Sequence, residues 1–206
     1  YEIMPSLVGS EMCIRDSTLA LNGAVSWGQY TYDSNPYYLQ TQDNSGDIVS
    51  DGYVYWKDFR VESTPQTAVN VGLSWRSNNN IYLSADFNYY NNMYLSMSPI
   101  YRTDAVITGG MAPGDIEHLR RQEKFDSAYT LNASIGKNWY IHRKYTLGFS
   151  LDVKNILNNQ DIKTGGYEQT RLSKNTETTV TTYQAFDSKY FYMFGTTYYL
   201  NLYFRF

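Results

Sequence analysis

The sequence predicts an all-β protein, an antiparallel sheet whose strands cross a membrane, and three observations support this. Apolar and polar residues alternate along most of the chain after residue 17, which is the period of a β-strand. Aromatic residues make up 17% of the 206 residues, including 22 Tyr, while charged residues make up only 18%, against roughly 25% in an average soluble domain. The connections between the alternating segments are long and short in turn.

Six segments carry the alternation. The first, residues 18–27, places Leu19, Leu21, Val25 and Trp27 on one side and small or polar residues on the other. The remaining segments are 69–76, 81–89, 129–135, 145–153 and 190–206. No charged residue stands on the apolar side of any of them. Since alternation fits any antiparallel sheet with one wet face, a soluble β-sandwich or barrel is the alternative.

Three details favour a membrane sheet. The polar sides hold Gly, Ser, Thr and Asn rather than the Lys and Glu of a solvated face, and Trp27, Trp75 and Trp139 stand near strand ends, as interfacial aromatics do. The connections are long at 33–52, 93–123 and 156–189 and short at 77–80 and 138–144. Short periplasmic turns and long external loops are typical of outer-membrane barrels, so we expect the C-terminus at the periplasmic face of the cell outer membrane.

Six strands are too few for a closed barrel, because known single-chain barrels begin at about eight strands. An open sheet would leave unpaired backbone groups at two edges in lipid, each costing several kcal/mol. We therefore expect residues 18–206 to be the C-terminal portion of a larger barrel.

Residues 1–17 differ from the rest. They hold the only cysteine, Cys13, and lack both the alternation and the richness in Tyr, Asn and Thr. The string resembles a spurious translated sequence found at the ends of assembled contigs, so we predict a non-native leader. An authentic N-terminal strand or tail is the alternative.

Several strings together resemble the C-terminal barrel region of TonB-dependent outer-membrane receptors of the Bacteroidota, of the SusC-like or carboxypeptidase-regulatory-like type. They are STPQTAVNVGLSWRS (63–77), YYNNMYLSMSPIYRT (89–103), QEKFDSAYTLNASIGKNWYI (122–141), LDVKNILNNQDIKTGGYEQTR (151–171) and FGTTYYLNLYFRF (194–206).

That resemblance implies a 22-stranded transmembrane β-barrel around an N-terminal plug, of which this chain would hold about the last six strands. It implies import of a nutrient such as a glycan, peptide or metal chelate, energised through TonB, ExbB and ExbD. The expected partners are outer-membrane lipid, the barrel-assembly machinery and a SusD-like surface lipoprotein. The alternating C-terminus resembles the assembly signal of such barrels, formed here by Tyr198, Leu200, Leu202, Phe204 and Phe206.

Two groups of residues are candidates for contacts inside a receptor. Aromatic faces pack on sugars and arginine forks bind carboxylates, so the substrate candidates are loop residues: Trp56, Tyr94, Tyr101, Arg102, Tyr167 and Arg171. Charges in a barrel belong on its lumen side, so the candidates for plug or lumen contact are Asp86, Lys124, Asp126, Asp152 and Lys154. Girdle or loop packing is the alternative for the first group.

The sequence gives no support for an enzyme, a cofactor, a metal or nucleic-acid binding. His118 and His142 lie far apart, and the calcium-loop spacing of Asp43, Ser45 and Asp47 fails after Gly46, where a plain turn is favoured. The net charge of −3 disfavours a nucleic-acid surface. Two further functions stay open: a passive porin-like channel, and a soluble Tyr-rich domain that binds carbohydrate.

Overall fold

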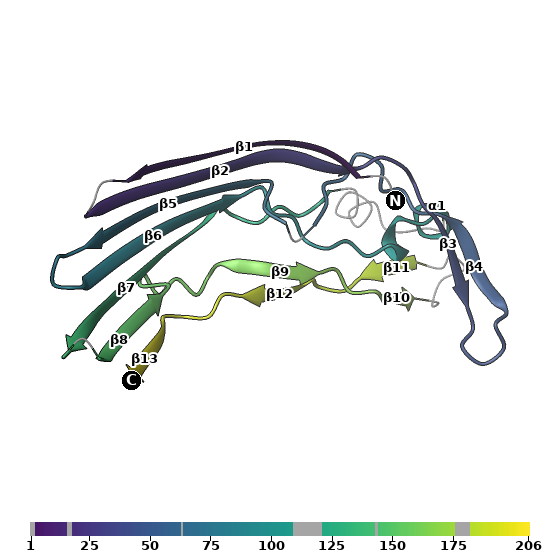
Figure 1. The fold of residues 1–206 in the computed structure, drawn as a ribbon. Helices are drawn as coiled ribbons and strands as arrows, with labels where there is room; N and C mark the ends of the chain where they lie inside the picture. The colour runs from purple at the N-terminus through teal and green to yellow at the C-terminus, as the bar shows by residue number, and fades with distance from the viewer. Residues whose placement is uncertain (1–2, 16–17, 63, 109–120, 143, 176–181) are drawn as a thin grey trace.

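The protein is all-β, and its main sheet is antiparallel throughout (Figure 1). The computed structural model describes residues 3–15, 18–62, 64–108, 121–142, 144–175 and 182–206. Seven strands follow the order β1-β2-β5-β6-β7-β8-β13. Their bounds are Ile3–Arg15, Leu19–Tyr32, Thr67–Arg76, Ile81–Asn91, Ala128–Ile141, Tyr145–Lys154 and Thr197–Arg205.

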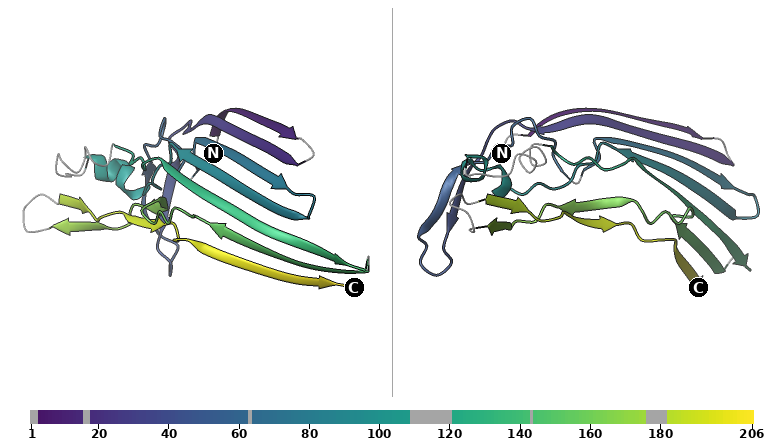
Figure 2. Two further views of the ribbon diagram at one scale, coloured as in Figure 1. Left: turned by 90° about the vertical axis from the view of Figure 1, so that its left-hand side faces the viewer. Right: turned by 180° about the vertical axis from the view of Figure 1, so that it is seen from behind.

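Short elements occupy the long connections. Three two-stranded ribbons project beyond the sheet: β3 with β4, β9 with β12, and β10 with β11 (Figure 2). Their bounds are Tyr37–Thr41, Ile48–Tyr53, Lys163–Tyr167, Lys189–Tyr192, Leu172–Asn175 and Thr182–Ala185. A 3-10 turn, Ile100–Arg102, and a short α-helical segment, α1 (Asp104–Thr108), lie between β6 and β7. Among the described residues, no helix is long and apolar enough to cross a membrane.

The two ends of the sheet differ. Residues 77–80 and 142–144 connect strands tightly at one end, which we call the turn side, and the C-terminus lies there too (Figure 1). The long connections 33–66, 92–127 and 155–196 lie at the other end, the loop side. The predicted alternation of long and short connections is confirmed.

The predicted last strand is wrong in one respect. Residues 190–206 were expected to form one continuous strand, but β12 pairs with β9 while β13 pairs with β8. The break has a local cause, because β8 ends at Lys154 and Asn155 takes a left-handed φ of 51°. The Asn155 amide then donates to the carbonyl of Phe194 at 3.0 Å, and Thr196 donates to the carbonyl of Asn155 at 2.8 Å. These contacts hold residues 193–196 outside both ladders.

Residues of the expected leader also form a strand. β1 pairs with β2 along its whole length, from Ile3 opposite Tyr32 to Arg15 opposite Ala20. This pairing does not test whether residues 1–17 belong to the natural protein, so the non-native leader stays a prediction.

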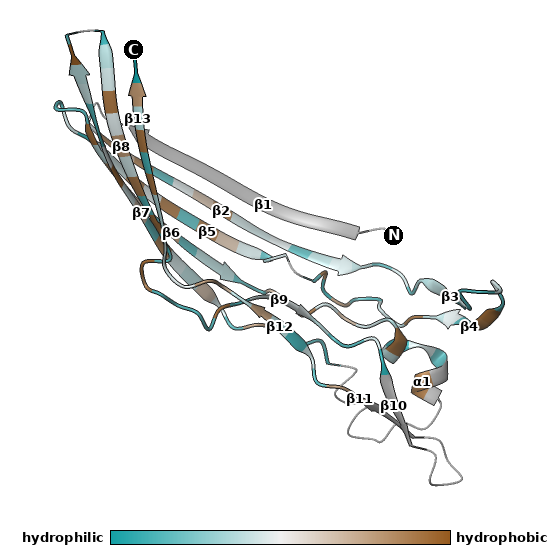
Figure 3. Cartoon of the chain, turned by 90° about the horizontal axis from the view of Figure 1, so that it is seen from below, coloured by the Kyte–Doolittle hydropathy of each residue, from teal (hydrophilic) through white to brown (hydrophobic). Residues whose placement is uncertain are grey.

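The register places the apolar residues of six strands on one face, and Figure 3 shows hydrophobic and hydrophilic residues following one another along these strands. One transverse row shows the pattern, because residues directly opposite in an antiparallel pair share a face. The apolar row is Leu19, Trp75, Leu83, Ile135, Leu151 and Leu200. The neighbouring row on the opposite face is Ala20, Ser74, Ser84, Ser134, Asp152 and Tyr199. The predicted division into an apolar and a polar face is therefore confirmed for β2, β5, β6, β7, β8 and β13.

The sheet is open within the described residues, with β1 at one edge and β13 at the other. Its hydrophobic core is not under the sheet. Among the described residues, the buried apolar side chains all lie in the long connections or at the loop-side ends of strands: Tyr32, Val54, Trp56, Leu95, Met97, Tyr101, Val106, Phe125, Ala128 and Ile162. The loop side therefore carries the packed interior of this chain.

Candidate functional site

The first candidate surface is the apolar face of the main sheet. Large side chains in the middle of the sheet are well exposed, with 41% of Leu83 and 40% of Phe87 accessible. Side chains of the same face with 38% or more exposed are Leu19, Leu21, Val25, Trp27, Val71, Leu73, Trp75, Tyr129, Ile135, Trp139, Ile141, Leu147, Tyr198, Leu200, Leu202 and Phe204. Contiguous apolar surface of this kind marks contact with a membrane or a protein partner.

The opposite face is polar but less accessible. Thr130 is only 6% exposed, and Gly72, Gly136 and Gly148 are buried. Short side chains bond across the strands, as in the amide of Asn70 donating to Asn88 at 2.9 Å and the hydroxyl pair of Ser84 and Ser134 at 2.7 Å. The polar side chains partly satisfy one another, whereas large side chains of the apolar face such as Leu83 and Phe87 stay about 40% exposed.

Glycines give the polar face its close contacts. The ring of Tyr82 lies directly over Gly136, where a Cβ atom would collide with it. Tyr203 crosses Gly148 in the same way and donates a hydrogen bond to Asn138, two strands away. A larger residue at either glycine would displace a tyrosine ring.

The loop side is held by a buried ion pair between two distant connections. The guanidinium of Arg102 contacts both carboxylate oxygens of Glu168, at 2.5 and 2.9 Å, and the side chains are 3% and 9% exposed. Glu168 also accepts the backbone N–H of Ser98 at 2.8 Å, while Arg102 donates to the carbonyl of Ser98 at 3.2 Å and lies over the ring of Phe59. This pair fastens connection 92–127 to connection 155–196.

Three of the six predicted substrate residues take part in this packing. Tyr101, Arg102 and Trp56 are 1%, 3% and 8% exposed. Trp56 stacks at a tilt on Tyr32, with ring centroids 5.1 Å apart. The hydroxyl of Tyr101 donates to the carbonyl of Arg171 at 3.0 Å, and burial raises the pKa of Tyr101. Each of the three has an observed structural role.

The other three predicted substrate residues are more accessible. Tyr94 is half-buried and pairs with Lys124 in an isolated bridge. Tyr167 is 44% exposed and lies beside Phe191, and the exposed Arg171 guanidinium lies over Phe186. Tyr101 and Arg171 meet, but the six do not form one pocket. Substrate contact by any of them stays a prediction.

The predicted lumen charges divide into two sets. Asp86, Asp152 and Lys154 lie on the polar face of the sheet, as their register shows. Lys124 and Asp126 lie in the connection before β7. Asp126 borders a small pocket of about 190 Å³ beside Asn159 and Lys163. Contact of these five residues with a plug stays a prediction.

A larger pocket of about 310 Å³ opens where the polar face meets the loop side. Lys154 is its charged lining residue, and its three side-chain amides all belong to asparagines. Its lining is Asn88, Tyr90, Thr130, Asn132, Lys154, Asn155, Met193, Phe194, Gly195 and Thr197. Among these residues only Lys154 was singled out from the sequence. The asparagines were visible as polar members of alternating segments, but nothing in the alternation showed that Asn155 would end a strand.

A second charged cluster joins the ribbon of β9 and β12 to the connection before β7. The Lys163 ammonium lies 3.2 Å from Glu123 and 3.9 Å from the ring centre of Tyr190, whose hydroxyl donates to Glu123 at 2.8 Å. Desolvation, and then the hydrogen bond to Glu123, raises the pKa of Tyr190 to about 12. The cluster binds loop segments to one another.

The weaker candidates for metal binding were the two histidines and the calcium-loop-like spacing at residues 43–47. His142 occupies the short turn after β7, and His118 lies outside the described residues. Asp43 and Ser45 lie at the tip of the hairpin of β3 and β4, where Gly46 takes a φ of 73°. Within the described ranges, no group of three or more potential metal ligands is present.

The predicted assembly residues lie along the open edge of the sheet. Tyr198, Leu200, Leu202 and Phe204 point to the apolar face of β13 and are 57% to 71% exposed, while Phe206 follows the strand at 93%. Their role in assembly stays a prediction. Comparison of the chain with models of known protein families and with curated proteins finds no match.

Proposed function

We propose that this chain is the C-terminal part of an outer-membrane β-barrel importer, a TonB-dependent receptor of the SusC-like type. One observation carries the proposal: large side chains in the middle of the apolar face, such as Leu83 and Phe87, are about 40% exposed, whereas Thr130 in the middle of the polar face is buried. Lipid is the environment that suits this arrangement. In water, each square ångström of exposed apolar surface forgoes roughly 25 cal/mol that burial would supply.

The connections support an orientation. Short turns and the C-terminus share one end of the sheet, and all the long connections share the other. In outer-membrane barrels the short turns face the periplasm. The turn side of this chain would then be periplasmic, and the ribbons with the buried Arg102–Glu168 pair would lie on the cell surface.

The open edges support a larger barrel. Within the described residues the outer edge of β13 is unpaired, and the outer edge of β2 pairs with β1, a strand of the predicted non-native leader. Unpaired backbone groups are costly in lipid. Further strands of a longer protein would pair with these edges, and the resemblance found in the sequence puts their total at 22. Import then rests on that resemblance, with TonB, ExbB and ExbD supplying energy through a plug and a SusD-like lipoprotein delivering the nutrient.

Long-read sequencing of the source DNA through the start of this reading frame is the direct test. We expect the frame to continue upstream for several hundred residues, with more alternating strands, a plug and a signal peptide. A frame that starts near Tyr1 would overturn the large barrel.

The importer and a passive channel differ in whether nutrient uptake needs the proton gradient. With the full receptor in its own membrane, nutrient uptake should stop when the proton gradient is dissipated. Uptake indifferent to the gradient would favour a porin. A soluble carbohydrate-binding domain would instead require the chain to fold in buffer without detergent.

A further inference from the structure

The turn side of the sheet combines positive charge with aromatic rings. Four basic side chains, which we call the turn-side rim, lie there: Arg76, Lys137, Lys144 and Arg205. No ion pair joins any of them to another described residue. The segments around them, 73–84, 133–150 and 200–206, contain no Asp or Glu. The side chains of these three segments therefore carry net positive charge.

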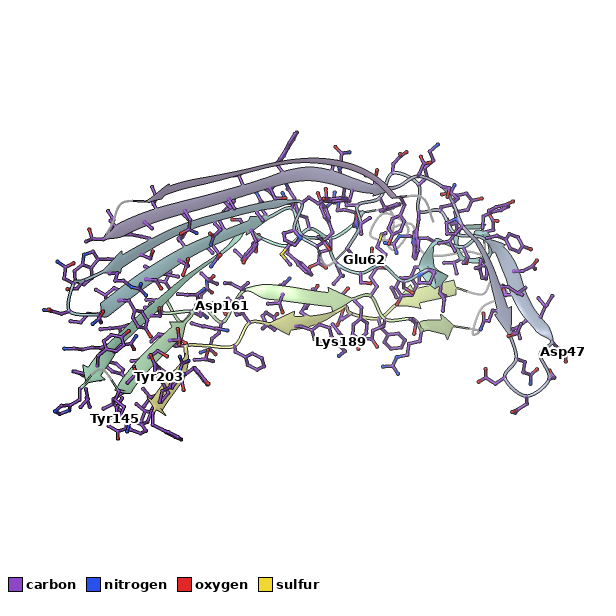
Figure 4. The ribbon with its side chains drawn as sticks, in the orientation of Figure 1. Asp47, Glu62, Tyr145, Asp161, Lys189 and Tyr203 are labelled. Carbon is purple, nitrogen blue, oxygen red and sulfur yellow. The ribbon has the colours of Figure 1, made fainter. Side chains whose placement is uncertain are left out.

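Three of these cations lie over aromatic rings. Lys137, Lys144 and Arg205 are 5.2, 5.4 and 5.6 Å from the ring centres of Trp139, Tyr145 and Tyr203, respectively. Tyr145 and Tyr203 both lie at this end of the sheet (Figure 4). Amphipathic aromatics and snorkelling basic side chains are the residues that occupy the boundary between hydrocarbon and lipid headgroups.

Lys137 is the most telling member. It lies on the apolar face, opposite Ile81 and Phe149, and it is the one charged residue on that face in the six strands whose side chains are described. Its ammonium reaches Trp139, which is two residues nearer the turn. The Lys137 side chain starts on the apolar face and directs its ammonium towards the end of the strand. A lysine at the edge of the hydrocarbon layer extends in this way to place its charge among the lipid headgroups.

The loop side is different in charge. Its connections hold most of the acidic residues, including Asp51, Asp104 and Glu123, and two of its basic residues, Arg102 and Lys163, have carboxylate partners. Anions are therefore attracted to one end of the sheet and not generally to both.

We propose that the turn-side rim binds the phosphate groups of anionic phospholipids in the leaflet that surrounds the short turns. The inference rests on the proposed membrane sheet and adds the lipid class that this end recognises. The ligand is a lipid headgroup, because Lys137 belongs to the surface that the acyl chains would cover. Near a charged membrane surface, each basic side chain contributes about 1 kcal/mol, which corresponds to about a fivefold change in affinity.

The test uses the 206-residue chain in a neutral detergent. Phosphatidylglycerol and phosphatidylcholine, each with a dansyl group on an acyl chain, are titrated into the micelles, and energy transfer from tryptophan reports binding. We expect tighter binding of phosphatidylglycerol. In the Lys137→Gln/Lys144→Gln variant, its affinity should fall about 25-fold, at about fivefold for each side chain, and phosphatidylcholine binding should not change.

A matched control removes two exposed lysines from the loop side. The Lys57→Gln/Lys189→Gln variant should lose less than about twofold in affinity, since Lys57 lies in connection 33–66 and Lys189, in β12, lies away from the turns (Figure 4). A Lys137→Arg/Lys144→Arg variant keeps the charge and should keep the lipid preference. This second pair separates loss of charge from loss of folding.

Three results would overturn the inference: equal affinity for the two lipids, equal losses in the two glutamine variants, or displacement of phosphatidylglycerol by inorganic phosphate. Failure of the membrane sheet itself would look different. In that case neither lipid would give energy transfer with the unmodified chain.

Discussion

The sheet and the loop side of this protein are built on opposite rules. On the loop side, apolar side chains such as Leu95 and Tyr101 are 1% exposed, and charges such as Arg102 and Glu168 are paired. In the sheet, Leu83 and Phe87 are exposed while Thr130 is covered. One chain therefore contains a region with a packed apolar core and a sheet whose apolar face is left exposed. The comparison teaches that burial of apolar side chains follows a different pattern in each region.

Breaking the buried ion pair should have the largest effect, and only on the loop side. Arg102→Met would leave the Glu168 carboxylate buried without a partner, which costs about 3–5 kcal/mol. Hydrogen exchange in lipid–detergent micelles should show faster exchange of Ser98 and Glu168 amides, with β6 and β7 unchanged. Arg171→Met is the matched control, because Arg171 is exposed and has no carboxylate partner among the described residues. Equal acceleration of exchange in the two variants would contradict the role of the Arg102–Glu168 ion pair in holding the two connections together.

A charge on the apolar face should have the next largest effect. Phe87→Arg places a cation between Val71 and Leu131 on that face, in the middle of the sheet, and a cation near the middle of a bilayer costs about 2–4 kcal/mol. Ser84→Arg is the control on the polar face, opposite Ser74 and Ser134. Denaturant unfolding of the lipid-inserted protein measures both. A neutral Phe87→Arg would count against a lipid-facing sheet.

Glycine-to-alanine substitutions should distinguish the two faces of the sheet, with a smaller effect on the free energy of unfolding. In Gly136→Ala the new methyl group would collide with the ring of Tyr82, and overpacking of this kind costs about 1–3 kcal/mol. Gly23 lies on the apolar face, where the nearest atom to a new Cβ is the Asn70 carbonyl oxygen at 3.8 Å. Gly23→Ala should leave the unfolding free energy unchanged or slightly raised. Similar losses at both sites would show that the polar face is not the tighter one.

The smallest effect is a pH dependence confined to the loop side. The pKa of Tyr190 is raised to about 12 in the folded protein, above the value of 10.0 of a free tyrosine. The folded state therefore holds this proton more tightly, and its stabilising effect is present below pH 10 and is lost as the pH rises towards about 12. Exchange at β9 and β12 should accelerate over that window, and Tyr190→Phe should abolish this part of the change. An unaltered profile in the variant would remove Tyr190 as the cause.

The sheet could be predicted from the sequence because its signal is local. Alternation at Ile81, Leu83 and Phe87 sets both the strand and its face, with no information about distant residues needed. The predicted segment ended at residue 135, whereas β7 continues to Ile141, and so the charge of Lys137 on the apolar face was missed. Residues 136–141 continue the alternation except at Lys137, where a charged residue takes an apolar position. The strand register is what assigns Lys137 to the apolar face.

The loop side could not be predicted in the same way. Arg102 and Glu168 are 66 residues apart, and no periodicity links them. Arg102 and Tyr101 were chosen for chemistry that suits ligands, and the same chemistry serves buried packing. The end of β8 at Asn155 likewise depends on long-range bonds to Phe194 and Thr196, which the alternation of residues 190–206 conceals.

Quenching of tryptophan by lipids brominated on the acyl chains tests the central claim most directly. Two single-tryptophan variants of the chain, retaining Trp75 on the apolar face or Trp56 in the loop core, would be compared in lipid–detergent micelles. We predict strong quenching of Trp75 and little quenching of Trp56. An unquenched Trp75, or equal quenching of the two, would contradict the assignment of the apolar face to lipid.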